Sequence, residues 1–390
     1  MPFIEQLLNG ENVEWKPLGE VITIEKGKQL NKSLLTESGE YPAYNGGVTY
    51  SGFTDKYNYS ENKIIISQGG ASAGFVNFIT TKFYANAHCY VVLPNISKVD
   101  NKYVYHLLKM NQENLMGKQL GAGIPALHTA NILGISIPIP CPDNPTKSLD
   151  IQHKIVEILD KFTELEAELE AELDCRKRQY EYYRNQLLSF DMLNKGGQKL
   201  NSVNVMTLGE IGEIRMCKRI LKGQTSTCGD VPFYKIGTFG KTPNAFISKK
   251  LFTEYKIKYS YPKIGEVLIS ASGTIGKTVI FDGQDAYFQD SNIVWIENDE
   301  SMALNKYLYY CYQVIKWKTA EGGTINRLYN DIIKKTQIPL PPLSVQREIV
   351  EILDKFDTLC NSISEGLPKE IELRRKQYEY YRNQLLTFAQ

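Results

Sequence analysis

Two long phrases each occur twice in this chain. The first reads QHKIVEILDKF from Gln152 to Phe162 and QREIVEILDKF from Gln346 to Phe356, 194 residues later. The second reads QYEYYRNQLLSF from Gln179 to Phe190 and QYEYYRNQLLTF from Gln377 to Phe388, 198 residues later. A period this long is typical of a duplicated domain and not of a solenoid, whose repeats are much shorter. A fold of two similar halves is therefore predicted.

Weaker similarity extends into the segments that precede these phrases. Leu18-Gly19-Glu20 recurs as Leu208-Gly209-Glu210, and each segment closes on an IPxP sequence, at Ile137 and at Ile338. β-branched and aromatic runs bounded by Gly, Asn and Ser predict strands at 63–67, 90–93, 266–270 and 292–296. Helices are expected near 102–109 and 306–316. Each of these segments is therefore predicted to be a mixed α and β domain.

The order along the chain is head, rod, head, rod. Head 1 is expected at 1–150, rod 1 at 151–190, a linker at 191–204, head 2 at 205–341 and rod 2 at 342–390. Ten positions of rod 1, spaced alternately by four and three residues, include eight apolar or aromatic side chains, among them Tyr183. Rod 2 repeats this seam from Ile349 to Leu367, with Ile363 on it, and resumes it at Tyr378; Pro368 should interrupt its helix. Such spacing indicates helices that pack lengthwise.

The predicted fold class is α+β. Two mixed α/β heads are expected to be separated by two long helices, packed as an antiparallel coiled coil with a pseudo-two-fold internal repeat. A helix of ~40 residues is about 60 Å long, so such a pair would fix the distance between the heads.

Composition narrows the functional classes. The seven cysteines form no CxxC pair and no zinc-ligand spacing with the four histidines, so neither a metal nor another cofactor is predicted. The first residues, MPFIEQLLNGENVEW, include acids and no apolar run, and no segment approaches the ~18 apolar residues of a membrane span. A cytoplasmic protein is expected.

Local charge distinguishes the two heads. Between Glu213 and Lys263 there are eleven Lys and Arg residues but only three Asp and Glu, with four tyrosines interleaved. A basic, aromatic surface favours a phosphate backbone as partner, although a solvated surface is the simpler alternative. Between Val21 and Ala73 of head 1 the charges balance, and loops rich in Gly, Asn and Gln stand out instead. Amide side chains can bond adenine edges, and Arg or Lys can read guanine.

One motif resembles a nucleotide-binding loop. Ala271 to Thr278 reads ASGTIGKT, but the following VIFDG predicts a strand and a turn, where a phosphate-binding loop requires a helix. The matching segment of head 1 lacks the Lys-Thr pair. We therefore interpret this stretch as a turn between two strands, with Lys277 free to meet a phosphate or a base.

The arrangement resembles the specificity subunit of type I restriction–modification systems. The resemblance rests on LGE opening each head, IPxP closing it, and the two phrases QxxIVEILDKF and QYEYYRNQLL in each rod. It implies a subunit without catalytic activity, whose two heads are target recognition domains that each read one half of a split, asymmetric DNA site. It also implies that the rods space the half-sites and dock two methylation subunits per chain, with restriction subunits attached through them. TELEAELEAELD, from Thr163 to Asp174, looks like the short tandem repeat that sets spacer length in this family.

Carried over by matching position, the resemblance places DNA-reading loops at 44–45, 68–72 and 126–128 of head 1, and at 234–235, 271–277 and 326–329 of head 2. Together with the local charge, it gives twelve candidate DNA-binding residues. They are Tyr44, Asn45, Gln68, Ser72, His128, Lys218, Arg219, Lys235, Ser272, Lys277, Arg327 and Tyr329. The competing hypothesis is an assembly scaffold whose heads bind protein, and a third is an NTPase at Gly276-Lys277-Thr278.

Overall fold

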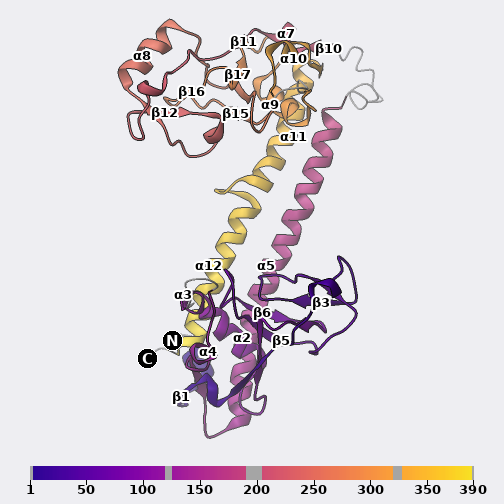
Figure 1. Ribbon diagram of the computed structural model, residues 1–390, viewed down its shortest axis with the longest axis vertical. Helices are drawn as coiled ribbons and strands as arrows, with labels where there is room; N and C mark the ends of the chain where they lie inside the picture. Colours follow the sequence, from indigo (N-terminus) through magenta and orange to yellow (C-terminus); the bar gives the residue numbers. More distant parts are fainter. Residues whose placement is uncertain (1–2, 119–124, 190–203, 319–326, 389–390) are drawn as a thin grey trace. The chain divides into compact units, whose positions relative to one another are not determined.

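The computed structural model describes residues 3–118, 125–189, 204–318 and 327–388 (Figure 1). It divides into two compact units. Unit 1 consists of Met1–Ala171 and Lys369–Gln390, and unit 2 of Glu172–Pro368. Each unit therefore combines one head with helical segments that come from both rods. The predicted linker, 191–204, lies outside the described residues except for Asn204.

Head 1 is built on two sheets. The larger is antiparallel, in the order β2 (Ile22–Lys26), β8 (Cys89–Pro94), β5 (Lys63–Ser67) and β6 (Val76–Ile79). In the smaller, β3 (Tyr41–Tyr44) pairs antiparallel with β4 (Gly52–Thr54) and parallel with β7 (Tyr84–Ala85). Its helices are α1 (Phe3–Leu8), α2 (Asn101–Met110), α3 (Gln112–Gly117) and α4 (Thr129–Leu133).

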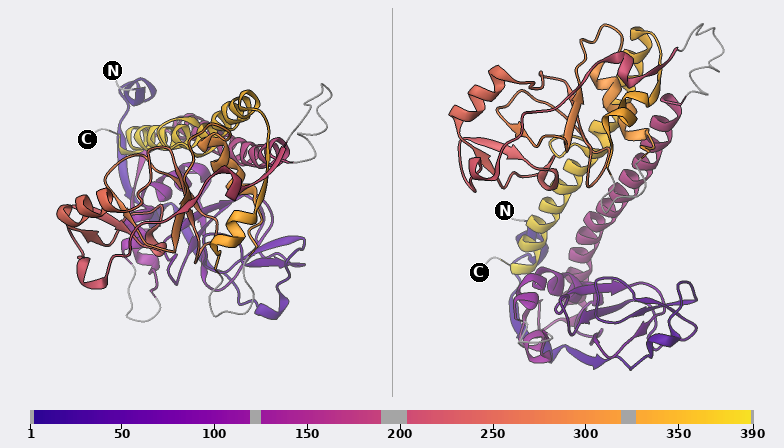
Figure 2. Two further views of the ribbon diagram at one scale, coloured as in Figure 1. Left: turned by 90° about the horizontal axis from the view of Figure 1, so that it is seen from above. Right: turned by 45° about the horizontal axis from the view of Figure 1, so that its top comes forward.

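Head 2 repeats this topology. Its larger sheet has the order β11 (Ile214–Arg215), β17 (Ile293–Ile296), β14 (Val267–Ser270) and β15 (Thr278–Ile280). In its smaller sheet, β12 (Val231–Tyr234) pairs antiparallel with β13 (Phe246–Ile247) and parallel with β16 (Tyr287–Phe288). Its helices are α7 (Leu208–Ile211), α8 (Lys249–Lys258), α9 (Asn305–Val314) and α10 (Asn330–Lys335). Within unit 2, α8 lies at the end of the head farthest from the rod helices (Figures 1 and 2).

Each head is closed by a two-stranded ribbon that joins its beginning to its end. In head 1, β1 (Val13–Pro17) pairs with β9 (Ser136–Pro140). In head 2, β10 (Asn204–Thr207) pairs with β18 (Gln337–Leu340). β9 and β18 carry the two IPxP sequences, so these mark the closing strand of each copy.

The rods form the predicted helices. Rod 1 is one continuous helix, α5 (Pro145–Leu187), and rod 2 is α11 (Leu343–Asn361) followed by α12 (Gly366–Thr387). Pro368 lies in the first turn of α12, where proline is tolerated, so the interruption predicted there is confirmed. Ile363 was predicted on the seam but lies in the break and is 83% exposed, because the chain leaves the helix at that point.

Within each unit the helices pack antiparallel. In unit 1, Phe162 of α5 stacks on Tyr381 of α12, with ring centroids 5.2 Å apart. In unit 2, Phe356 of α11 stacks on Tyr180 and Tyr183 of α5, with ring centroids 6.2 and 5.6 Å apart. Tyr183 is 40% exposed, so this seam position is only partly covered.

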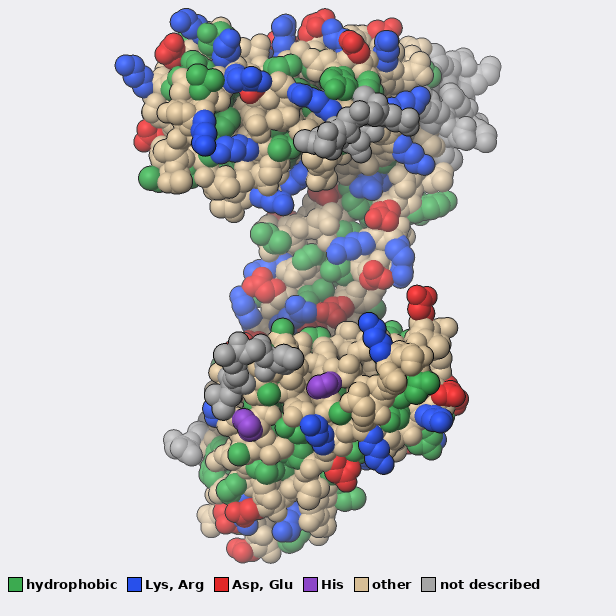
Figure 3. All heavy atoms as spheres, in the orientation of Figure 1, with side chains coloured by type: hydrophobic (Ala, Val, Ile, Leu, Met, Phe, Trp, Pro, Cys, Tyr) green, Lys and Arg blue, Asp and Glu red, His purple; other side chains and the backbone are tan. Residues whose placement is uncertain are grey.

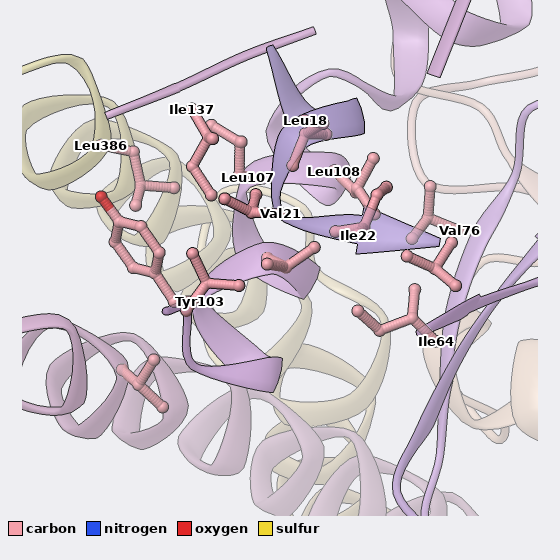
Figure 4. Packing of buried hydrophobic residues seen from close by; sticks show 14 of the residues in the cluster. Leu18, Val21, Ile22, Ile64, Val76, Tyr103, Leu107, Leu108, Ile137 and Leu386 are labelled. Carbon is pink, nitrogen blue, oxygen red and sulfur yellow. The ribbon is translucent and has the colours of Figure 1, made fainter. Parts of the chain in front are cut away.

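The second repeated phrase of each copy completes the core around the opposite head. Tyr378, Leu385 and Leu386 of α12 belong to the same buried cluster as Tyr103 and Ile137 of head 1 (Figure 4). In unit 2, the buried cluster of head 2 includes Tyr180, in α5, and Leu188. The first phrase instead packs on its own head, through Ile155 and Leu159 in unit 1 and Ile349 and Leu353 in unit 2.

A buried glutamine fastens each rod to its own head. Gln346 of α11 is fully buried; its Oε1 accepts from Leu304 N at 2.8 Å, and its Nε2 donates to the carbonyls of Met302 and Pro341, both at 2.8 Å. Gln152 of α5 occupies the same place in unit 1 and accepts from Asp100 N at 2.8 Å. A single amide thus satisfies main-chain groups that would otherwise be buried without partners.

We expect Gln346→Leu to lower the free energy of unfolding of unit 2 by about 2 kcal/mol, because buried main-chain groups lose their partner. For a unit of this size the corresponding drop in Tm is about 4–8 °C, measurable by calorimetry. Arg347→Ala changes an exposed neighbour on α11 and serves as the control, with an unchanged Tm. Equal Tm values for Gln346→Leu and the control would contradict this role of Gln346.

Candidate nucleic-acid interface

In both heads the predicted reading loops meet at one place. In head 1, Gly69 pairs with Ala126 in an isolated β-bridge, and Leu127 N donates to Gln68 O at 2.8 Å. In head 2, Ser272 pairs with Arg327, and Leu328 N donates to Ala271 O at 2.8 Å. The loops are therefore joined by equivalent main-chain contacts, although their side chains differ. Asn326 of the last predicted loop lies outside the described residues.

A third loop is held to the same place by a turn before the central strand of each head. Asn86 N donates to Tyr44 O and Gln289 N donates to Tyr234 O, both at 2.9 Å. At the other end of this turn, the carbonyls of His88 and Asn292 accept from Gln68 N at 2.8 Å and Ala271 N at 2.7 Å. We name these segments the head-1 turn (86–88) and the head-2 turn (289–292). The head-2 turn is one residue longer, and Ser291 within it has φ +58°, in the left-handed region.

Head 2 carries a polar, basic cleft of about 330 Å³ around its turn. Its basic lining residues are Arg219, Lys222, Lys235 and Arg327. The whole head-2 turn also lines the cleft, together with Thr225, Ile220 and Phe233. Figure 3 shows Lys and Arg side chains spread over this head. Three of the predicted DNA-binding residues, Arg219, Lys235 and Arg327, are thus brought together.

Residues of the head-2 turn bond to every loop that surrounds the cleft. Gln289 Oε1 accepts from Ile236 N at 2.9 Å, and Asp290 Oδ2 accepts from Arg219 Nε at 2.8 Å. Ser291 O accepts from Arg327 Nη2 at 3.0 Å, and Asn292 Oδ1 accepts from Ser272 Oγ at 2.8 Å. One turn therefore holds two of the four basic side chains, Arg219 and Arg327.

Other predicted residues of head 2 lie differently. Lys277 was predicted to be free, but its Nζ donates to Phe239 O at 2.6 Å and its side chain is half-buried. The ammonium is therefore held by a main-chain carbonyl, and a contact between Lys277 and DNA stays a prediction. Lys218 is exposed, with its Nζ 5.2 Å from the centroid of the Tyr259 ring, and does not line the cleft. Tyr329 is 52% exposed, and the Arg327 guanidinium lies 5.9 Å from its ring centroid.

The turn between β14 and β15 is confirmed as a loop joining two antiparallel strands. Gly276 has φ +79°, and a Cβ at this residue would lie 2.4 Å from the Trp317 ring. The loop therefore turns back against an aromatic side chain, and no helix follows it. This geometry offers no helix N-terminus to a nucleotide phosphate.

In head 1 the predicted residues surround its turn without a comparable charge. Asn45 and His128 are exposed, and Gln68 and Ser72 are half-buried. Tyr44 packs edge-on against Phe83 at 5.8 Å, and burial raises the pKa of its hydroxyl. These side chains can donate and accept hydrogen bonds, but none of them carries a permanent charge.

Cys89, which follows the head-1 turn, ties down the loop after β3. Its Sγ accepts from Gly46 N at 3.2 Å and lies 3.3 Å from Tyr44 O. Burial raises the pKa of this thiol to about 11, so it stays protonated at neutral pH and can donate to that carbonyl.

Equivalent positions show how the two heads have diverged. At a constant offset of 190 residues, Arg219 corresponds to Gln29 and Lys235 to Asn45, whereas Lys222 corresponds to Lys32. Arg327 corresponds to Ala126, since these residues form the equivalent β-bridge. Sequence reasoning counted Lys222 among the basic residues of head 2 without selecting it as a DNA contact, and it missed Asp290, whose bond to Arg219 exists only in the folded chain.

A second duplicated surface lies on the rods. Tyr182 is 60% exposed and Tyr380 is 61% exposed, at identical places in the second phrase. Each ring contacts the ring of the next tyrosine, at 5.5 Å in unit 2 and 5.4 Å in unit 1. In unit 1, Tyr380 borders an apolar hollow of about 620 Å³ whose lining includes Phe162 and Leu385. Both units therefore present an exposed tyrosine pair beside apolar side chains.

Within residues 3–118, 125–189, 204–318 and 327–388, no group of three or more His, Cys, Asp and Glu side chains is arranged to hold a metal ion. Likewise, no helix in the described part of the chain is long and apolar enough to cross a membrane.

Comparisons with known proteins agree along nearly the whole chain. Residues 10–174 and 201–373 each match the family described as type I restriction modification DNA specificity domain. A putative type I restriction enzyme specificity subunit of Haemophilus influenzae is 50% identical over 400 residues, covering 99% of this chain and 98% of that protein. The EcoR124I/EcoR124II specificity subunit of Escherichia coli is 35% identical over 417 residues, covering 100% and 97%.

A solved structure shares the fold. The S subunit of a type I restriction-modification system from M. genitalium superposes with a TM-score of 0.60 at 22% identity, covering 97% of both chains. The repeat in the sequence had predicted this architecture: a duplicated domain, heads of mixed α and β structure, and long helices. The chain belongs to the specificity subunits of type I restriction–modification systems, the non-catalytic components that recognise the DNA sequence.

Proposed function

We propose that this subunit recognises a bipartite, asymmetric DNA site, with one half-site read by each head. The observation that carries the proposal is the pair of equivalent loop assemblies whose main-chain contacts match while their side chains differ. Two readers of the same architecture and unlike chemistry would recognise unlike sequences. The twelve predicted residues, together with Lys222, are the proposed contact set.

The two heads are proposed to contribute unequally to the grip on DNA. Lys222 and Lys235 line the head-2 cleft, and among the described residues neither ammonium group has an ion pair, so both remain available to phosphate. Contacts of this kind position a protein on the duplex without reading bases. Head 1 offers neutral Asn45 and Gln68 instead, which suit hydrogen bonds to base edges.

The exposed tyrosine pairs are the proposed docking sites for methylation subunits. Tyrosine supplies large contact area with little loss of side-chain freedom, and it is enriched where binding energy concentrates. The pair occurs once per unit in an identical phrase, so one chain would bind two copies of the same partner, and restriction subunits would join through them. We further propose that the complex works in the cytoplasm, without a cofactor bound to this subunit. In the competing hypothesis, a protein scaffold, the tyrosine pairs would be used in the same way but the heads would bind protein and not DNA.

Replacing head 2, residues 205–341, by the head of another specificity subunit should change one half of the recognised site and leave the other half intact. The replacement head should carry tyrosine at the positions that correspond to Tyr307 and Tyr310, because these side chains lie in the core completed by α5. Mapping methylated bases in cells that express the chimera with its methylation subunits gives the measurement. A change in both half-sites would refute the assignment of one half-site per head, and absence of any sequence preference in the unaltered complex would favour the scaffold.

Tyr182→Glu and Tyr380→Glu should each weaken the binding of one methylation subunit by at least about 30-fold, because a buried carboxylate replaces an aromatic contact. The double variant should lose both subunits. Native mass spectrometry of the reconstituted complex counts them. Ile363→Glu alters a side chain that is 83% exposed and lies outside the repeated phrases, and it should retain both. Two bound subunits in the double variant would rule out this docking surface.

A further inference from the structure

We infer that Arg219, oriented by Asp290, reads a guanine in the half-site of head 2. This inference rests on the proposed function, because it requires that head 2 contacts bases. Within that function it assigns the base, the reading side chain and the residue that positions it. Arg219 is the specificity-determining residue, and Asp290 acts only through it.

The geometry fixes the Arg219 guanidinium from one side. Its Nε donates to Asp290 Oδ2 at 2.8 Å, and the Asp290 side chain is only 16% exposed whereas that of Arg219 is 68% exposed. Asp290 Oδ2 also accepts from Ser291 Oγ at 3.3 Å. The carboxylate is therefore held within the turn, and the guanidinium keeps its two Nη groups for a partner outside the protein.

The carboxylate of Asp290 favours a base, and not a phosphate, as the DNA group that Arg219 contacts. A nearby negative charge reduces the attraction between a cation and a phosphate, so an arginine meant to grip the backbone gains nothing from such a partner. A base reader depends on orientation instead, and anchoring Nε is what holds the planar fork in place. The two cleft lysines contrast with Arg219, since no carboxylate of the described chain pairs with Lys222 or Lys235.

The donor pattern selects guanine. After Nε is used, Arg219 can offer two parallel N–H donors, which match the N7 and O6 acceptors of guanine in the major groove. Adenine presents an amino group where guanine has O6, so one donor would face another donor. The discrimination expected for a bidentate contact of this kind is about 10- to 100-fold in affinity.

The pair formed by Arg219 and Asp290 has no counterpart in head 1. Gln29 stands at the position of Arg219, and Ala87 follows Asn86 where Asp290 follows Gln289. Head 1 therefore lacks both the fork and its anchor, although the head-1 turn and the head-2 turn accept and donate equivalent main-chain hydrogen bonds. The equivalent position of the other half-site should not depend on an arginine.

Three variants of the full complex with its methylation subunits test the inference. Arg219→Lys keeps the charge but loses the fork, Asp290→Asn keeps the size but loses the charged anchor, and Lys222→Gln removes a neighbouring lysine as the matched control. Each is titrated against the recognised duplex and against duplexes with one base pair altered, at several salt concentrations. Thermal unfolding of each variant checks that the chain remains folded.

Arg219→Lys should reduce the preference for one guanine of the head-2 half-site to about threefold or less, from about 10- to 100-fold, with an unchanged salt slope. Asp290→Asn should weaken discrimination at that same base pair. Lys222→Gln should weaken binding to all duplexes alike and lower the salt slope by about 1. The inference is overturned if Arg219→Lys leaves every preference intact, or if the relaxed position is not a guanine. An unaltered complex that binds all duplexes equally would instead contradict the proposed function itself.

Discussion

The structure depends on an exchange of buried side chains between the two copies of the duplication. Tyr378 and Leu386 from the second copy complete the core around head 1, and Tyr180 and Leu188 from the first copy complete the core around head 2. Neither copy therefore buries its apolar surface with its own residues alone. The same residues must fit two different heads, which gives a physical reason for the near identity of the two phrases. The heads, whose loops face solvent, are under no such constraint.

The repeat made much of the fold predictable. Apolar spacing indicated the helices, IPxP marked the closing strand of each head, and the strand predicted at 63–67 coincides with β5. The sequence did not predict which helix segment packs on which head, because both second phrases are equally apolar and either pairing satisfies the seam. It also placed Ile363 on the seam, since spacing alone does not show where the chain leaves a helix.

The candidate site was predicted less completely, for a different reason. Charge identifies side chains that can meet DNA, but it does not show which of them are already bonded within the protein. Lys277 is an example: it matched a phosphate-binding pattern, yet its ammonium donates to the Phe239 carbonyl. Asp290 is the opposite case, because an acid in a basic region attracts no attention until its bond to Arg219 is seen. The hydrogen-bond partner of each side chain depends on how the loops fold, so it cannot be inferred from the residue type alone.

Main-chain bonding explains how the heads can differ without losing their common architecture. The bonds to the carbonyls of Tyr44 and Tyr234, and those to Gln68 and Ala271, involve no side-chain atoms. A difference such as Gln29 in head 1 and Arg219 in head 2 therefore leaves these main-chain bonds unaltered while changing the side chain that the loop presents. The rods lack this freedom, since their contacts are made by the side chains themselves. Divergence of one surface and retention of the other thus follow from which atoms carry the contacts in each.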